Sequence, residues 1–185
     1  MTPFIRIDEH LSLHLARPEL AEAVFQAVAE NRAYLRKWLP WVDATRSVDA
    51  TKTFMRESMQ HNSDGRRLTT FILANGQVAG SLGVVHFNKE HCRCEIGYWL
   101  REDFQGKGIM TRACTSFMEF LFKKKGMNRL EILVIPTNEQ SRAVPIRLGF
   151  QSEGILRKAL RMHGSFHDVE VFSLLKDDWA VRKQI

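Results

Sequence analysis

Residues 102–113 read EDFQGKGIMTRA, in which Gly106 and Gly108 flank one lysine and an apolar, helix-like run begins at Thr111. A loop that enters a helix presents free backbone N–H groups and the positive end of the helix dipole, so it can bind an anion without cationic side chains. Glycines let the backbone approach a phosphate closely, but they also suit a tight turn that binds nothing. An isolated Gly-x-Gly motif leaves both interpretations open.

Two familiar phosphate-binding motifs do not fit this loop. A Walker loop needs Gly-Lys followed by Ser or Thr, whereas Gly108 is followed by Ile109. A dinucleotide fingerprint needs a third glycine, which would fall at Thr111, and a later acidic residue. The loop therefore belongs to another class.

The composition is that of a globular protein. The chain has 185 residues, 44% of them hydrophobic, with 12 Phe and 4 Trp, so we expect one domain over residues 1–185. No apolar run reaches the ~18 residues that cross a bilayer, and Arg6, Asp8 and Glu9 lie where a signal peptide would be apolar. We therefore expect a cytoplasmic location and no membrane partner. Three cysteines are an odd number, which favours reduced thiols over a structural disulfide.

The net charge of +6 favours anionic partners without identifying them. Phosphates, acidic proteins and nucleic acids all carry suitable charge. No aromatic-basic motif supports nucleic-acid binding, so we predict no specific nucleic-acid partner.

Periodicity and turn signals predict a mixed order of helices and strands. Pro18 opens the first helix, a second piece stops near Pro40, Ser47 caps the third helix, and Asn75-Gly76 forms a hairpin turn. The predicted helices cover residues 19–31, 34–38, 48–62, 111–125 and 139–148, and the predicted strands cover residues 11–15, 70–73, 78–87, 93–100, 130–135, 154–162 and 169–175. In the third helix one face is predicted to carry Val48, Thr51, Phe54, Met55 and Met59.

This order predicts an α/β (α+β) fold with a mixed, mostly antiparallel sheet flanked by helices. Strand 93–100, the glycine loop, helix 111–125 and strand 130–135 form one crossover unit, whose two strands should be parallel.

The loop resembles a known family signature. The run Gln105-Gly106-Lys107-Gly108-Ile109-Met110 is similar to the Gln/Arg-x-x-Gly-x-Gly/Ala motif of the GNAT superfamily of acyl-CoA N-acyltransferases, although Met110 replaces the usual small residue. Further segments resemble its RimJ/RimL-type branch, which acetylates ribosomal-protein N-termini, so the match extends across most of the chain. They are Trp38-Leu39-Pro40-Trp41, Glu95–Leu100, Asn138–Ser141, Leu148-Gly149-Phe150, Glu153-Gly154 and His167-Asp168.

The resemblance implies acetyl-CoA as the cofactor and a sheet whose central strands splay apart. An amide-containing pantetheine arm would then satisfy the unpaired backbone groups of Tyr98, Trp99 and Leu100 like an added strand. Asn138 would bind the arm from the other side, or cap the helix from Glu139, and the two roles can coexist. The diphosphate would lie on the backbone amides of Gln105, Gly106, Lys107, Gly108, Ile109, Met110 and Thr111.

The chemistry favours an α-amine over a lysine as acceptor. An α-amine has a pKa of about 7.7 to 8.0 against about 10.4 for lysine, so it needs less activation before it attacks the thioester directly. Glu95 is the candidate base or water-positioning group, and the alternative is a structural glutamate in an ion pair. Asp168 and Glu153 are weaker candidates, better explained as loop-fixing groups or arginine partners.

Other candidate residues carry structural alternatives as well. Ser141 would donate a hydrogen bond or proton to the departing sulfur, or serve as an ordinary polar residue in a first helical turn. Trp38 and Trp41 would shape the acceptor cleft or simply pack, and packing is the commoner role of tryptophan. A metal site is not predicted, because His86, His91, Cys92 and Cys94 lack a second ligand cluster.

The acceptor itself stays open. A ribosomal-protein N-terminus leads, a polyamine or an antibiotic amine is the alternative, and a non-catalytic CoA-binding or ribosome-docking module is a third possibility. A homo-oligomer is a further possibility, because apolar groups near the terminal strands are available for an interface.

Overall fold

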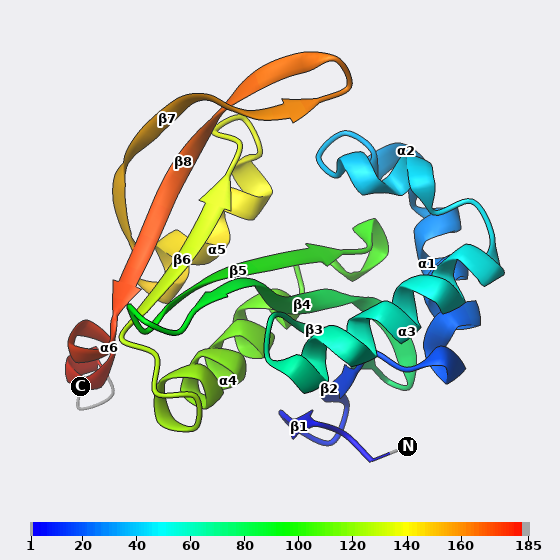
Figure 1. The fold of residues 1–185 in the computed structure, drawn as a ribbon, viewed down its shortest axis with the longest axis horizontal. Coiled ribbons are helices and arrows are strands. Elements are labelled where there is room, and N and C mark those ends of the chain that lie inside the picture. Colours follow the sequence, from blue (N-terminus) through cyan, green and yellow to red (C-terminus); the bar gives the residue numbers. More distant parts are fainter. Residues whose placement is uncertain (1, 183–185) are drawn as a thin grey trace.

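A computed structural model describes residues 2–182, which build one eight-stranded sheet flanked by helices (Figure 1). The strand order is β1-β2-β3-β4-β5-β6-β8-β7. The strands are β1 (Ile5–Arg6), β2 (Leu11–Leu15), β3 (Leu68–Ala74), β4 (Gln77–Asn88), β5 (Arg93–Leu100), β6 (Arg129–Val134), β7 (Gln151–Met162) and β8 (Ser165–Leu175). The helices are α1 (Ala21–Glu30), α2 (Arg32–Leu35), α3 (Val48–Asp64), α4 (Ile109–Lys123), α5 (Glu139–Leu148) and α6 (Lys176–Arg182), with 3-10 turns η1 (Pro18–Leu20), η2 (Pro40–Ala44) and η3 (Glu102–Phe104).

Every strand pair is antiparallel except β5 and β6, which α4 connects as a parallel crossover. This arrangement confirms the predicted fold class. The parallel pairing is short, because it joins only Arg93, Cys94 and Glu95 of β5 to Arg129, Leu130 and Glu131 of β6. Beyond these pairs the two strands diverge, so β1–β5 and β6–β8 form two arms of an open V (Figure 1). The predicted splay of the central strands is therefore present.

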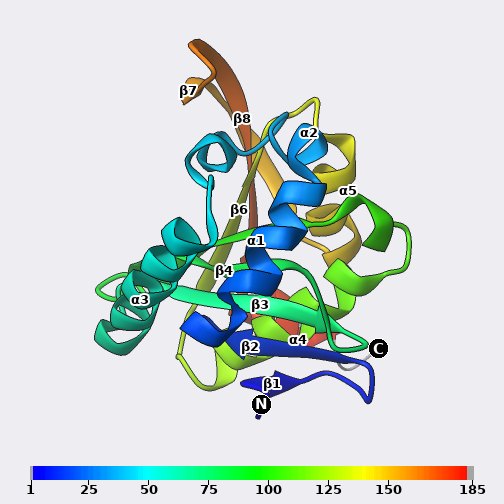
Figure 2. The same cartoon turned by 90° about the vertical axis from the view of Figure 1, so that its right-hand side faces the viewer.

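Helices cover the two faces of the larger arm unequally. Neighbouring residues of β3 show the division, because Ile72 packs in the cluster that contains α4, whereas Phe71 packs in the cluster that contains α1 and α3. Side chains of a strand alternate between the faces, so one apolar run serves both cores. Figure 2 shows α1 and α3 along the face opposite α4.

Local signals place the element ends correctly at several points. Ser47 accepts a hydrogen bond from the Ala50 N–H and caps α3, and Gly65 ends that helix in the left-handed region with φ 64°. Asn75 and Gly76 both have positive φ, 49° and 77°, as a two-residue hairpin of this hand requires.

One predicted helix face is partly wrong. The buried residues of α3 are Thr51, Met55 and Ser58, whereas Phe54 and Met59 are exposed. The reason is that α3 packs on β3 through a narrow stripe, so residues one position beside that stripe face away from the core. Sequence periodicity also missed β1 and α6, which are too short to show it.

No helix among residues 2–182 is both long and apolar enough to span a bilayer.

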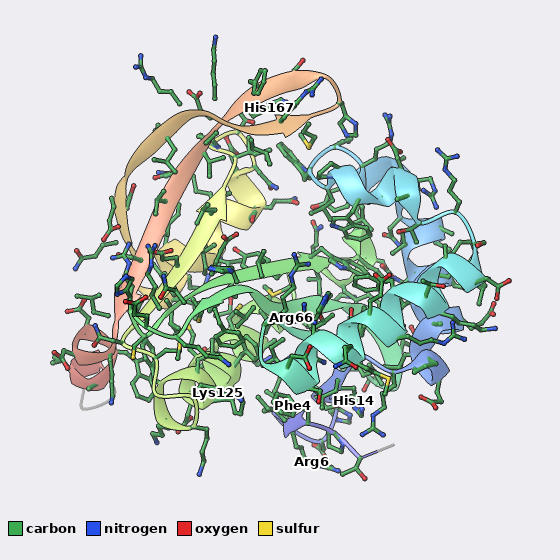
Figure 3. The ribbon with its side chains drawn as sticks, viewed as in Figure 1. Phe4, Arg6, His14, Arg66, Lys125 and His167 are labelled. Carbon is green, nitrogen blue, oxygen red and sulfur yellow. The ribbon has the colours of Figure 1, made fainter. Side chains whose placement is uncertain are left out.

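The fold buries one histidine without satisfying it. His14 of β2 is 6% exposed (Figure 3), and its Nε2 lies 3.0 Å from the Ser12 hydroxyl. Its Nδ1 has no hydrogen-bond partner within the part of the chain that the structure describes. Burial lowers the pKa of His14, and the positive charge of Arg17 lowers it further. The neutral ring is therefore the form that the fold tolerates.

This burial predicts acid-sensitive stability. The unfolded chain protonates His14 near pH 6.5 and the folded chain only at lower pH, so the free energy of unfolding should fall as the pH drops below about 6.5, by up to about 1.4 kcal/mol per pH unit. His14→Phe should remove that component. Urea unfolding of both proteins between pH 7.5 and pH 5 measures it, and identical pH slopes in the two proteins would contradict the prediction.

Candidate active site

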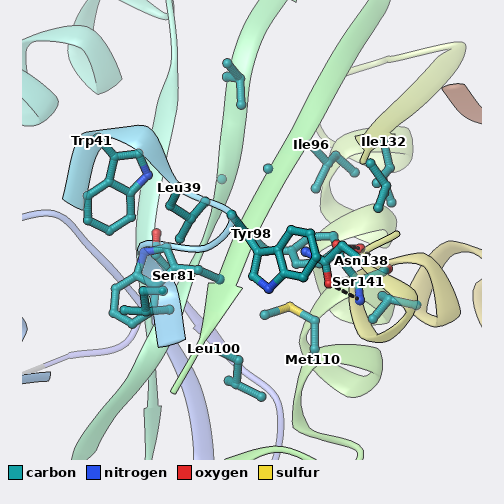
Figure 4. A pocket seen from close by; sticks show the side chains of 18 of the residues that line it. Leu39, Trp41, Ser81, Ile96, Tyr98, Leu100, Met110, Ile132, Asn138 and Ser141 are labelled. Carbon is teal, nitrogen blue, oxygen red and sulfur yellow. Dashed lines mark hydrogen bonds between the residues drawn. The ribbon is translucent and has the colours of Figure 1, made fainter. Parts of the chain in front are cut away.

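The divergence of β5 and β6 opens a cavity of about 1410 Å³ between the two arms of the sheet. Its lining comes from the glycine loop, β5 and β6, the start of α5, the segment around η2, parts of α1, α3, β3 and β4, and three residues of the β7–β8 hairpin, Ala159, Leu160 and Val169. Figure 4 shows Trp41 on one side of this cavity and Asn138 and Ser141 on the other. The residues predicted for the cofactor and for the acceptor therefore border one space.

The loop after β5 exposes its backbone to this cavity. Gly106 and Gly108 are in the left-handed region, with φ 71° and 68°, and Gly108 is the N-cap of α4. No side chain caps this helix, and a Cβ added at either glycine would meet no atom within 4 Å. The first N–H groups of a helix have no intrahelical partner, so the loop offers a positive, open backbone surface.

Other groups of the loop are already engaged. The Gln105 N–H donates to the Glu102 carbonyl at 3.2 Å, so the available amides are those from Gly106 to Thr111. The Lys107 side chain turns back to donate to the Asp103 carbonyl at 2.8 Å and lies 5.4 Å from the centre of the Phe104 ring. The Lys107 ammonium group is therefore already engaged, and Lys107 itself is not among the residues that line the cavity.

Two arginines add positive charge beside the start of α4. Arg112 and Arg147 both line the cavity, and Arg147 donates to the Thr111 hydroxyl at 3.1 Å. Arg112 also pairs with Asp8. Local charge and the helix dipole therefore have the same sign at this end of the cavity.

The free edge of β5 runs along the cavity. From Ile96 to Leu100 this strand pairs with β4 on one side and has no β6 partner on the other. Gly80 of β4 holds the paired side close, because a Cβ there would lie 2.1 Å from the Trp99 carbonyl oxygen. The Trp99 carbonyl therefore points toward β4, and the neighbouring residues Tyr98 and Leu100 turn their backbone groups to the free edge, where they can accept an extended, amide-bearing ligand.

Three polar side chains converge where α5 begins. Asn138 lines the cavity, and its side-chain oxygen accepts from the Ser141 N–H at 3.2 Å and caps the helix (Figure 4). The Tyr98 hydroxyl donates to the Ser141 carbonyl at 2.9 Å. The Ser141 hydroxyl in turn donates to the Tyr98 hydroxyl at 3.4 Å. Burial raises the pKa of Tyr98, so this hydroxyl keeps its proton.

Glu95 lies on the other side of β5, with Gly97 and Trp99, and it lines the cavity. Its register partner is Glu131 of β6. Burial raises the pKa of Glu95, the negative charge of Glu131 raises it further, and His86 opposes them. Glu131 itself is held by Arg93 at 3.3 Å and Arg129 at 2.7 Å.

The two weaker acidic candidates lie elsewhere and have structural partners. Glu153 pairs with Arg129 and accepts from the Ser173 hydroxyl at 2.7 Å, and these bonds lower the pKa of Glu153 to about 2. Asp168 accepts from the Lys158 N–H at 2.8 Å, which fixes a left-handed residue of β7 at φ 53°. Both roles agree with the prediction that these groups pair or fix loops.

Trp38 and Trp41 both border the cavity. Trp41 is 39% exposed and its ring centre lies 6.0 Å from that of Trp99. Trp41 can therefore form part of the cleft wall and also pack against Trp99, so the two roles considered from the sequence are compatible.

Comparison with known proteins places this geometry in a family. Residues 10–151 match the family model of the acetyltransferase (GNAT) domain. The chain belongs to the GNAT acetyltransferase family. It is therefore an N-acetyltransferase, and acetyl-CoA is its acetyl donor.

Several relatives of this GNAT protein span nearly its whole length. It is 32% identical to a Bacillus subtilis protein provisionally named ribosomal N-acetyltransferase YdaF, over 96% of this chain and 98% of that one. It is 27% identical to the ribosomal-protein-serine acetyltransferase of Escherichia coli, over 96% and 99% of the two chains.

Two solved structures share the fold with a TM-score of 0.90. One is RimL, the ribosomal L7/L12 alpha-N-protein acetyltransferase, in complex with coenzyme A, at 28% identity over 94% of this chain and 98% of that one. The other is the microcin C7 self-immunity acetyltransferase MccE in complex with acetyl-CoA and AMP, at 27% identity over 95% and 97% of the two chains.

The residues of this GNAT site fit acetyl-CoA. The open glycine cradle and the free edge of β5 are the two features that a diphosphate and a pantetheine arm need. We expect the amides from Gly106 to Thr111 to hold the diphosphate, and Tyr98 to Leu100 with Asn138 to hold the arm. When bound, the cofactor supplies the thioester carbon that the amine attacks.

Sequence reasoning missed some groups at this site. The Tyr34 hydroxyl donates to Gln140 at 2.9 Å, and a ring nitrogen of His163 lies 2.7 Å from the Arg36 carbonyl. The first contact joins α2 to α5 between two residues that line the cavity, and the second joins the end of α2 to the hairpin tip. In each contact the two partners are more than a hundred residues apart in the chain, so no local sequence pattern could have revealed the pairing.

The glycine cradle yields a direct binding prediction. Gly108→Val forces a β-branched residue into φ 68° and places methyl groups over the amides, so acetyl-CoA affinity should fall at least tenfold, about 1.4 kcal/mol. Gly126→Val is the matched control, because Gly126 at the far end of the same helix has φ 67° and equally open space. Calorimetric titration with acetyl-CoA measures the effect, and equal losses in both variants would indicate strain instead of a lost contact.

Proposed function

We propose that this chain transfers the acetyl group of acetyl-CoA to the α-amine of a protein N-terminus, with a ribosomal protein as the leading acceptor. One observation carries the proposal: Glu95 is the sole carboxylate among the described residues that line the cavity. A single weak base suits an amine with a pKa of about 7.7 to 8.0, whereas a lysine at about 10.4 would need stronger activation. The names of the ribosomal-protein acetyltransferases among the relatives support this choice of acceptor.

In the proposed reaction the neutral amine attacks the thioester, and Glu95 accepts the proton that the nitrogen then releases, directly or through one water. Its raised pKa suits this task, because a general base works best when its pKa lies near the working pH. Backbone N–H groups near Trp99 and Leu100 are placed to stabilise the negative charge that develops on the carbonyl oxygen. The free edge of β5 keeps those donors available.

The hydroxyl pair of Tyr98 and Ser141 lies on the other side of β5 from Glu95. We assign Ser141 to the departing sulfur, whose conjugate acid has a pKa near 8.5 and needs only a hydrogen bond or one proton. Tyr98 orients Ser141, because its own proton is committed to the Ser141 carbonyl at 2.9 Å. Base and acid thus act from opposite faces of one strand.

The acceptor approaches on the Glu95 face. Trp38 and Trp41 would border its path, and Tyr34 and Gln140, which both line the cavity, are joined by a hydrogen bond. A free chain end passes such a bounded opening more easily than the middle of a folded surface. An acceptor on a ribosomal protein would place the reaction in the cytoplasm.

A small amine-bearing molecule is the second candidate acceptor. The same TM-score of 0.90 relates this chain to MccE, an acetyltransferase of microcin C7 self-immunity. A cavity of about 1410 Å³ also has room for an acceptor larger than a simple amine.

The acceptor class is tested with matched peptides. We expect thiol release from acetyl-CoA with a decapeptide that has a free N-terminus and no lysine. The same peptide with an acetylated N-terminus and one internal lysine should react at least ten times more slowly. Acetylation of small amines alone, with neither peptide reacting, would favour the second candidate, and no thiol release with any amine would indicate a non-catalytic module.

The role of Glu95 is tested through the pH profile of kcat/KM. As the pH falls, the α-amine is protonated first and Glu95 second. In a plot of log kcat/KM against pH, the slope on the acid side should therefore steepen from about one to about two. Glu95→Gln should remove the second break and lower kcat by about 10²-fold. Glu131→Gln removes a negative charge that raises the pKa of Glu95, so the second break should move to lower pH. A profile unchanged in both variants would exclude Glu95 as the base.

A further inference from the structure

The acceptor side of the cavity has an apolar wall. Trp41, Phe54, Val85 and Leu133 are between 38% and 48% exposed, and all four line this cavity. Large apolar side chains that gather at a cavity without covering one another mark a binding surface. Phe54 is one of the two residues that periodicity placed on the apolar face of α3 and that the fold leaves exposed.

One cation on this wall has no partner. Arg67 lies between α3 and β3, lines the cavity and is exposed. Its guanidinium makes no hydrogen bond and no ion pair with any residue in the range 2–182. The adjacent Arg66 differs, because it pairs with Asp64 at 2.6 Å and does not line the cavity (Figure 3).

The other cavity-lining arginines have other tasks. Arg112 pairs with Asp8, and Arg147 donates to Thr111 beside the start of α4. Both lie at the cofactor end of the cavity. Leu68, next to Arg67, packs in the core cluster that contains α4, so Arg67 points to the opposite face of the sheet. Its charge therefore faces the acceptor, not the diphosphate.

Strand register gives the spacing between Arg67 and Glu95. Leu68 of β3 pairs with Val84 of β4, so the preceding residue, Arg67, lies beside Val85 in the β4 bulge. His86, the next residue of β4, pairs with Glu95 of β5. Arg67 and Glu95 therefore lie on opposite sides of β4, two strand spacings apart. Two strand spacings amount to about 10 Å. An extended peptide advances about 3.3 Å per residue, so a chain whose α-amine lies at Glu95 reaches Arg67 with its second or third side chain.

We propose that Arg67 selects acceptors that carry an acidic side chain at the second or third residue, while the apolar wall holds the intervening chain. The proposal rests on the N-terminal acetylation proposed above and adds the chemistry of the acceptor sequence. A carboxylate can accept two parallel hydrogen bonds from a guanidinium, and the apolar neighbours reduce the competing water.

Arg67 can be changed without disturbing the proposed base. The charged groups that shift the pKa of Glu95 are Glu131 and His86. Arg67 is also exposed, so its replacement leaves no cavity and no unpaired partner. A change in acceptor preference would therefore report recognition and not folding or base strength.

The experiment compares decapeptides that share a free N-terminus and differ by one Glu or Gln at residue 2, 3 or 6. In the wild-type protein Glu at residue 2 or 3 should raise kcat/KM about three- to tenfold over Gln, mainly through KM, and Glu at residue 6 should not. Arg67→Gln should abolish the preference. Arg67→Glu should reverse it, so that a peptide with Lys at that position becomes the better acceptor.

Arg66→Gln is the matched control and should keep the full preference. The preference should also weaken as salt rises, because both charges are solvent-accessible. Peptides that react equally well with either residue, or an Arg67→Gln variant that keeps the preference, would overturn this inference and leave N-terminal acetylation standing. Failure of every peptide to react, with turnover of small amines, would overturn both.

Discussion

The end of the β5–β6 pairing at Glu95 is the constraint on which the site depends. Each strand continues with its other neighbour, β5 with β4 as far as Leu100 and β6 with β8 as far as Val134. Neither strand can follow the other, and a bulge between Val84 and His86 adds local twist to the β4–β5 pair. The separation of β5 from β6 leaves one edge of β5 unpaired and opens the cavity between the two strands. The pairing of β5 with β4 and of β6 with β8 keeps the two strands apart.

The two faces of β5 divide the chemistry. Ile96, Tyr98 and Leu100 face α4, on the side where we expect the glycine loop and the start of α5 to hold the cofactor. Glu95 and Trp99 face the other way, toward the apolar wall on which we place the acceptor. Because successive residues of a strand alternate, one eight-residue segment can position the donor and the acceptor on opposite sides of a single reacting atom.

The sequence predicted the features that depend on a few neighbouring residues. The caps at Ser47 and Asn138, the hairpin at Asn75-Gly76 and the glycine loop all follow from local backbone chemistry. Features that depend on distant packing were not predictable. The exposure of Phe54 is set by how α3 lies on β3, and the free charge of Arg67 becomes visible only when the cavity is known. The contact between Tyr34 and Gln140 depends on the packing of α2 near α5, and a local stretch of sequence carries no information about that packing.

The distribution of arginines explains why Glu95 stands apart from the nearby carboxylates. Arg129 binds both Glu131 and Glu153, and the pKa of Glu153 falls to about 2 as a result. Glu95 has no such cation among the described residues. Burial raises the pKa of Glu95, and the charge of Glu131 across the short parallel pairing raises it further. Neighbouring acids whose environments separate their pKa values in this way have different tasks. Glu153 and Glu131 fix the base of the V, and Glu95, which has no arginine partner among the described residues, is the carboxylate that we propose as the base.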